Sequence, residues 1–234
     1  CPTRISELRA AMSTFLTGNG TIARMGMAIY PSDPPGVGNT GTVMGCGPSG
    51  PGDIRVQLTN SNDVDAELTA AATAINTQIQ SLAVTGGTPT ADSLRFIGNY
   101  APLADPDRED FVLLLTDGLP NCNGMNPNTC TNAVACKCTT SACTTTHGPC
   151  KAGCLDSDNS AAAVTELRTK KIRTIVVGFG ADTASGDGPD TLNAMAEAGG
   201  FARSCPDAGD GACGGAPGSC DVGTKLCRTK FFQA

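Results

Sequence analysis

The chain has 234 residues, the size of one large domain, and its formal net charge at pH 7 is −6. A domain of this length can bury roughly 70% of its unfolded surface, so a second full domain is not required. The acidic balance and the lack of a basic stripe exclude nucleic acid as a partner, because phosphate binding needs clustered Lys and Arg. No apolar stretch approaches the roughly 20 residues that span a bilayer, so we expect no transmembrane segment.

Cysteine is the most informative residue type, with 13 residues. Seven lie between Cys122 and Cys154, four lie between Cys205 and Cys227, and Cys1 and Cys46 stand apart. This density is typical of disulfides made in an oxidising compartment, so we expect an extracellular or outer cell-surface location. Because the total is odd, at least one cysteine has no partner within the chain.

The first half of the chain shows alternating helical and strand patterns. Apolar spacing predicts a helix over 3–16 and strands over 24–30 and 54–58. A 3.6-residue rhythm over 64–82 predicts a long helix, and another begins near Ala91 with Thr90 placed to cap it. The unbroken run FVLLL at 111–115 is typical of a parallel strand covered on both faces.

The second half continues the alternation around two cysteine-rich segments. No periodicity is visible over 120–156, which we interpret as a disulfide-stapled insertion. Asp158 or Ser160 is placed to cap the helix that follows, and residues 172–179 form a second buried strand. A helix over 192–198 should end at Gly199 and Gly200. The cysteine-rich loop 204–228 then leads to a short strand near 231–232.

Strands that alternate with helices predict an α/β fold, with a doubly wound, mostly parallel sheet flanked by helices. We interpret residues 1–234 as a single domain, in which 120–156 and 204–228 are disulfide-rich insertions.

Four segments, in this order, resemble the von Willebrand factor A family of the bacterial extracellular type. They read VTGGTPTADSLRFI, FVLLLTDGLPN, IRTIVVGFG and LNAMAEAGG. The resemblance implies a metal ion-dependent adhesion site at the carboxyl edge of the sheet, built from a DxSxS motif, a threonine and an aspartate. Thr88 matches the threonine and Asp117 the aspartate. It further implies that Mg²⁺ or Ca²⁺, with Mn²⁺ as a third option, is held there and engages an acidic side chain of a protein ligand.

The sequence departs from this family at its start. The DxSxS strand should precede the first helix, yet only Cys1 and Pro2 stand before the helix predicted over 3–16. We therefore expect the remaining ligands upstream of Cys1, and expect the missing first strand to come from the remainder of the polypeptide or from another chain. The family's closing helix is also missing after FFQA.

Other candidate sites have simpler interpretations. Asp156–Ser160, DSDNS, superficially matches DxSxS, but helix capping is the better account. The acidic loops around Asp182, Asp187 and Asp190 could bind Ca²⁺, although solvated turns explain them as well. A CxxxxCxxxHxxC array has the residue types of a zinc site, but disulfides are favoured in an oxidising compartment. The array consists of Cys138, Cys143, His147 and Cys150.

We thus expect an adhesion or protein-binding module that is not an enzyme and uses the metal site at Thr88 and Asp117. The first alternative is a metal-independent structural module of a surface assembly, such as a pilus, motility or adhesin complex. The second alternative is a zinc-dependent enzyme centred on the cysteine and histidine array.

Overall fold

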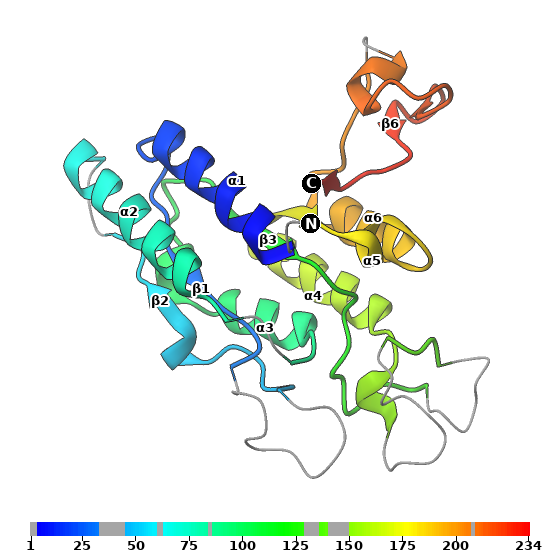
Figure 1. Cartoon of the computed structure of the whole chain (residues 1–234), viewed down its shortest axis with the longest axis horizontal. Helices are drawn as coiled ribbons and strands as arrows, with labels where there is room; N and C mark the ends of the chain where they lie inside the picture. The colour runs from blue at the N-terminus through cyan, green and yellow to red at the C-terminus, as the bar shows by residue number, and fades with distance from the viewer. Residues whose placement is uncertain are drawn as a thin grey trace.

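Helices and strands alternate along the chain in this computed structural model, which describes residues 4–32, 45–59, 63–83, 86–128, 136–139, 150–206 and 209–234 (Figure 1). The α-helices are α1 (Arg4–Asn19), α2 (Asp65–Ser81), α3 (Thr90–Ile97), α4 (Ser157–Thr169), α5 (Ala181–Ala184) and α6 (Gly188–Gly199). The strands are β1 (Met27–Ala28), β2 (Ile54–Val56), β3 (Asp110–Thr116), β4 (Ile172–Gly178), β5 (Cys220–Asp221), β6 (Leu226–Cys227) and β7 (Phe232–Gln233). The short 3-10 helices among these residues are η1 (Pro51–Asp53), η2 (Ala101–Leu103), η3 (Cys150–Gly153) and η4 (Gly209–Cys213).

The main sheet is parallel and has the strand order β3-β4-β7. β3 and β4 pair over their full lengths, from Asp110 opposite Ile172 to Thr116 opposite Gly178. A separate antiparallel pair joins β1 to β2, and a small hairpin joins β5 to β6. The prediction of an α/β fold with a parallel sheet and flanking helices is therefore confirmed. Within the described residues, however, β3 has a hydrogen-bonded neighbour on one edge only.

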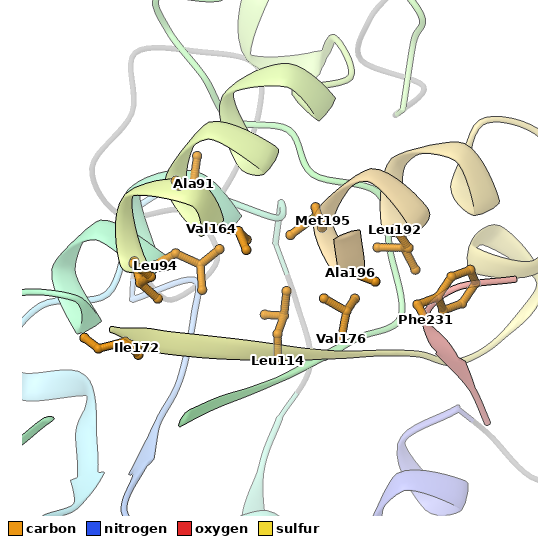
Figure 2. Packing of buried hydrophobic residues seen from close by; sticks show 12 residues of the cluster. Ala91, Leu94, Leu114, Val164, Ile172, Val176, Leu192, Met195, Ala196 and Phe231 are labelled. Atoms are coloured by element: carbon orange, nitrogen blue, oxygen red, sulfur yellow. The ribbon is translucent and has the colours of Figure 1, made fainter. Parts of the chain in front are cut away.

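The core lies on one face of the main sheet, beneath α3, α4 and α6. Figure 2 shows apolar side chains of these helices directed at those of β3 and β4. Val164, Leu192 and Met195 are fully buried, and Phe231 closes the core beside β7. Burying a side chain of this size contributes about 1.5–3 kcal/mol, so this one-sided core is the main source of stability. Its buried members are Ala91, Leu94, Leu114, Ala163, Val164, Leu167, Ile172, Val176, Leu192, Met195, Ala196 and Phe231.

The opposite face of β3 is open, which corrects the expectation that this strand is covered on both faces. Leu114 is 4% exposed, whereas its neighbours Phe111 and Leu113 are 39% and 43% exposed. Successive side chains of a strand point to opposite faces, so the alternation means that the described residues bury one face of β3 and leave the other partly exposed. On the open side, the Arg173 guanidinium lies 3.9 Å from the ring centre of Phe201.

A second, smaller apolar cluster joins α1 and α2 to the β1-β2 pair. Leu16, Ile75 and Ile79 are buried in it, and α1 and α2 lie side by side (Figure 1). Arg9 of α1 donates to the carbonyl oxygens of Ile79 and Leu82, at 3.3 and 2.7 Å. A cation beside the last carbonyls of a helix is favourable, so this contact fixes the end of α2.

Helix ends show where local prediction succeeds and fails. Gly200 follows α6 with φ +76°, in the left-handed region, which confirms the predicted glycine end. Thr90 is the first residue of α3 rather than its cap, which is Pro89. The cap of α4 is Asp156, so Asp158 and Ser160 lie inside that helix, and the prediction that either caps it is wrong.

Disulfides join distant parts of the chain, as the cysteine content predicts. Four pairs have both cysteines described, namely Cys46–Cys122, Cys136–Cys154, Cys205–Cys220 and Cys213–Cys227. The last two staple the segment around β5 and β6 into a lobe that projects away from the sheet (Figure 1). Among the described residues, no helix combines the length and apolar character needed to cross a membrane.

Candidate metal site at the carboxyl edge of the sheet

The structure brings the two predicted metal ligands to the same edge of the sheet. Asp117 directly follows β3, and Thr88 lies two residues before α3. A Cβ added to Gly118 would lie 3.3 Å from Thr88 Oγ1, so the threonine hydroxyl faces the residue next to Asp117. Both side chains are partly exposed. Hydroxyl and carboxylate oxygens are the ligand types that a hard cation such as Mg²⁺ prefers, so the residues present fit such an ion.

Asn121 connects the loop that carries Thr88 with the loop that carries Asp117. Its backbone N–H donates to Thr88 O at 2.9 Å, and its side-chain Oδ1 accepts the Thr88 N–H at 2.7 Å. Asn121 is only 4% exposed, so water does not compete for these bonds. Sequence reasoning missed this residue, because nothing in the run LPN distinguishes it from an ordinary turn asparagine.

A disulfide links two loops near this edge of the sheet. Cys46 and Cys122 are separated by 76 residues, and their Cα atoms are 5.3 Å apart. Nearby, the Gly87 N–H donates to Gly45 O at 3.0 Å. The disulfide therefore ties the loop after β3 to the loop that follows β1, and the Gly87 hydrogen bond adds the loop before α3. The isolated position of Cys46 in the sequence was the only signal for this clamp.

Arg4 places the start of α1 at this edge. Its Nη1 donates to Asp117 O at 3.0 Å and to Asp182 Oδ2 at 2.9 Å. Asp182, considered above as a Ca²⁺ ligand, is thus paired with an arginine. Because the guanidinium binds the backbone carbonyl of Asp117, the Asp117 carboxylate is left out of this contact.

A buried tyrosine hydroxyl lies near the same residues. Burial raises the pKa of Tyr30, against the opposing effect of the neighbouring hydroxyls of Thr116 and Thr90. None of these neighbours reaches hydrogen-bond geometry, and the Tyr30 hydroxyl has no partner within the described residues. An unsatisfied buried hydroxyl costs about 1–3 kcal/mol, so this edge holds an unused hydrogen-bonding group.

The remaining acidic candidates have contacts that do not include Thr88. Asp187 pairs with Lys137, and Asp190 lines a separate pocket of about 230 Å³ between the first turns of α4 and α6. Asp156 accepts hydrogen bonds from the side chains of Asn123 and Asn159, at 2.7 and 2.9 Å. It caps α4 by position but makes no side-chain cap bond. The DSDNS segment is therefore a helix start, as predicted, with a polar cluster of its own.

Cysteine sulfurs offer no thiolate ligand where they are described. Cys138 is disulfide-bonded, as favoured above over zinc binding, which removes it from the CxxxxCxxxHxxC array. Cys143 and His147 lie outside the described residues, and the side chain of Cys150 is not described. The sulfurs of Cys205, Cys213 and Cys220 lie within 4.8 Å of one another only because two disulfides stand side by side.

Comparison of the chain with protein-family models, with curated proteins and with solved structures gives no match. The functional argument therefore depends on the residues and their geometry.

Proposed function

We propose that the chain is a protein-binding or adhesion module of the cell exterior, which uses a divalent cation at Thr88 and Asp117 to engage an acidic group of a partner. The observation that carries the proposal is the approach of the Thr88 hydroxyl to the Asp117–Gly118 turn at the carboxyl edge of a parallel sheet. Open α/β sheets bind their ligands at this edge. The disulfides support an oxidising location.

The chain's own residues would hold the ion and leave room for a partner. Thr88 would offer its hydroxyl and Asp117 its carboxylate, while Asn121 and the Cys46–Cys122 disulfide hold the two loops in place. Mg²⁺ requires near-octahedral coordination and retains water, so two protein oxygens leave positions for water and for a carboxylate from the partner. The bound cation would supply the positive charge that attracts that carboxylate.

We further propose that the free edge of β3 accepts an extended strand, either from the remainder of the polypeptide or from another chain. In the described residues, no strand pairs with the edge of β3 that faces away from β4, and the short β1-β2 pair forms a separate sheet. An unpaired strand edge presents backbone groups that favour pairing with another strand. α1 begins beside the carboxyl end of β3, because Arg4 contacts Asp117. A strand parallel to β3 would therefore end near the cation site and could supply its remaining ligands.

Titration calorimetry with Mg²⁺ tests the cation site. Measured with the strand-supplying segment or chain present, wild type should take up Mg²⁺. Asp117→Ala and Thr88→Ala should abolish or strongly weaken this uptake, because each removes one oxygen ligand. Asp190→Ala is the matched control, since it removes a carboxylate from the separate pocket at α6. Unchanged Mg²⁺ binding in Asp117→Ala would remove Asp117 from the site.

A metal-independent structural module is the second candidate, and the open face of β3 favours it. Phe111 and Leu113 of β3 are 39% and 43% exposed, so a neighbouring subunit could cover them. Amide hydrogen exchange over 110–116 tests strand addition, measured on the chain alone and in its native assembly. Slower exchange in the assembly, together with no Mg²⁺ uptake, would favour the structural module. Equal exchange in both samples would contradict strand addition.

A further inference from the structure

Asn121 holds both backbone groups of Thr88 at once. Its N–H donates to Thr88 O at 2.9 Å, and its Oδ1 accepts the Thr88 N–H at 2.7 Å. The pair thus has two short hydrogen bonds between residues that are 33 positions apart. Because N–H and C=O are fixed together, the orientation of the Thr88 Cα–Cβ bond is fixed as well, and with it the position of the hydroxyl.

The amide nitrogen of the Asn121 side chain contacts the cysteine-rich segment. Asn121 Nδ2 donates to Thr139 Oγ1 at 2.9 Å, and Thr139 Oγ1 donates to Gly153 O, also at 2.9 Å. The Thr88 backbone N–H can only donate, so the Asn121 atom facing it must be the oxygen. The amide nitrogen therefore faces Thr139, whose hydroxyl proton is already committed to Gly153.

Thr139 is itself firmly anchored. Its backbone N–H donates to Gly153 O at 3.0 Å, and the Leu155 N–H donates to Lys137 O at 2.8 Å. The Cys136–Cys154 disulfide joins the same two segments, 136–139 and 150–155, and both of its cysteines are buried. A continuous series of contacts thus leads from this disulfide, through Thr139 and Asn121, to Thr88.

We propose that Asn121 is a positioning residue, through which the segment around the Cys136–Cys154 disulfide fixes the Thr88 hydroxyl for cation binding. The cation part of this inference rests on the proposed function, whereas the positioning of Thr88 does not. Groups that orient a metal ligand without touching the metal typically change metal affinity by about 10–100-fold when removed. Asn121 is such a group, because it bonds the backbone of Thr88 and leaves the Thr88 hydroxyl to the cation.

An amide is the side chain that satisfies both neighbours here. Aspartate has the same shape and could accept the Thr88 N–H, but it cannot donate to Thr139. Its second oxygen would face a hydroxyl oxygen whose proton is bonded to Gly153, in a site that is 4% exposed. Asn121→Asp should therefore disturb the loop, but less than Asn121→Ala, because the carboxylate still accepts the Thr88 N–H.

Amide hydrogen exchange in the metal-free protein tests the positioning. Asn121→Ala should speed exchange at the Thr88 N–H by about 10-fold or more, because its acceptor is lost. Asn121→Asp should speed it less, because the carboxylate keeps an acceptor for that N–H. Thr139→Val should cause a smaller increase, since it frees only the far side of the amide. Asn126→Ala is the matched control. Asn126 is 2% exposed and donates to Leu155 O at 3.0 Å from the same loop, so its loss should leave Thr88 exchange unchanged.

Calorimetry with Mg²⁺ on the same variants tests the consequence for the cation. Asn121→Ala should raise the Mg²⁺ dissociation constant about 10–100-fold, whereas Asn126→Ala should not, even if both lower the melting temperature. Thr88 exchange that is equal in wild type and Asn121→Ala would overturn the inference. Equal Mg²⁺ affinity in these two proteins would overturn its cation part. A wild type that takes up no Mg²⁺ refutes the proposed function and the cation part, while the exchange result still decides whether Asn121 positions Thr88.

Discussion

Gly87 packs directly against the sulfur of Cys122. A Cβ added at Gly87 would lie 2.3 Å from Cys122 Sγ and 2.9 Å from Asn121 Oδ1, closer than real side chains approach. The residue that precedes Thr88 is thus enclosed by the disulfide and by the asparagine that holds Thr88. Only glycine allows the two loops to come this close.

Gly87→Ala should therefore lower the free energy of unfolding by about 1–3 kcal/mol, the usual cost of forcing an extra methyl into a filled site. Chemical denaturation of the oxidised protein measures this change. Gly124→Ala is the matched control, because a Cβ there would meet no atom within 4 Å. Equal stability of the two variants would show that the loops can separate without cost.

Removal of the Cys46–Cys122 disulfide should cost more than removal of Cys213–Cys227. The first closes a separation of 76 residues and the second one of 14. Loop-closure entropy then predicts losses of about 4.5 and about 3 kcal/mol. The double variants Cys46→Ala/Cys122→Ala and Cys213→Ala/Cys227→Ala, compared by denaturation, check the order. The opposite order would mean that native contacts, rather than the unfolded chain, dominate the effect.

Two adjacent leucines of β3 should respond very differently to truncation. Leu114 is 4% exposed and belongs to the core, whereas Leu113 is 43% exposed on the open face. Leu114→Ala should lower the free energy of unfolding by about 2–5 kcal/mol, because it leaves a cavity. Leu113→Ala should cost less than about 1 kcal/mol, since a large part of Leu113 already contacts solvent and its removal leaves no enclosed cavity. A similar loss for both would show that a further layer covers the second face in solution.

Acid should weaken the disulfide-stapled lobe through Asp210. The backbone N–H groups of Cys220 and Gly218 donate to its carboxylate at 2.8 and 2.9 Å, and they hold the pKa of Asp210 below its ordinary value of 3.8. A lowered folded-state pKa means that the stabilisation is complete above the ordinary value and is lost as the pH falls through the lowered value.

Asp210→Asn should consequently weaken the lobe at neutral pH, because its amide nitrogen cannot accept the second N–H. The difference between wild type and variant should stay constant down to about pH 4 and shrink below it. Amide exchange at Cys220, followed from about pH 7 to pH 3 and corrected for the intrinsic pH dependence, measures this difference. A difference that does not change with pH would mean that the Asp210 charge contributes nothing to the lobe.

The sequence by itself determined the elements whose pattern is local. The apolar runs before Thr116 and Gly178 specify β3 and β4, because short apolar runs rich in Val, Leu and Ile are typical of strands in a parallel sheet. The rhythm of α2 and the glycines after α6 are equally local signals. Since the carboxyl ends of parallel strands share an edge, the position of Asp117 at that edge also followed from the sequence.

Only the tertiary structure decided what each element contacts. The FVLLL run reads the same whether helices cover one face or two, because composition does not reveal which layers are present. The Cys46–Cys122 disulfide joins residues 76 positions apart, and the hydrogen bonds of Asn121 to Thr88 join residues 33 positions apart. No sequence periodicity predicts either contact. Such contacts arise when separately formed elements pack together, so the fold, and not any local motif, fixes the geometry of this edge.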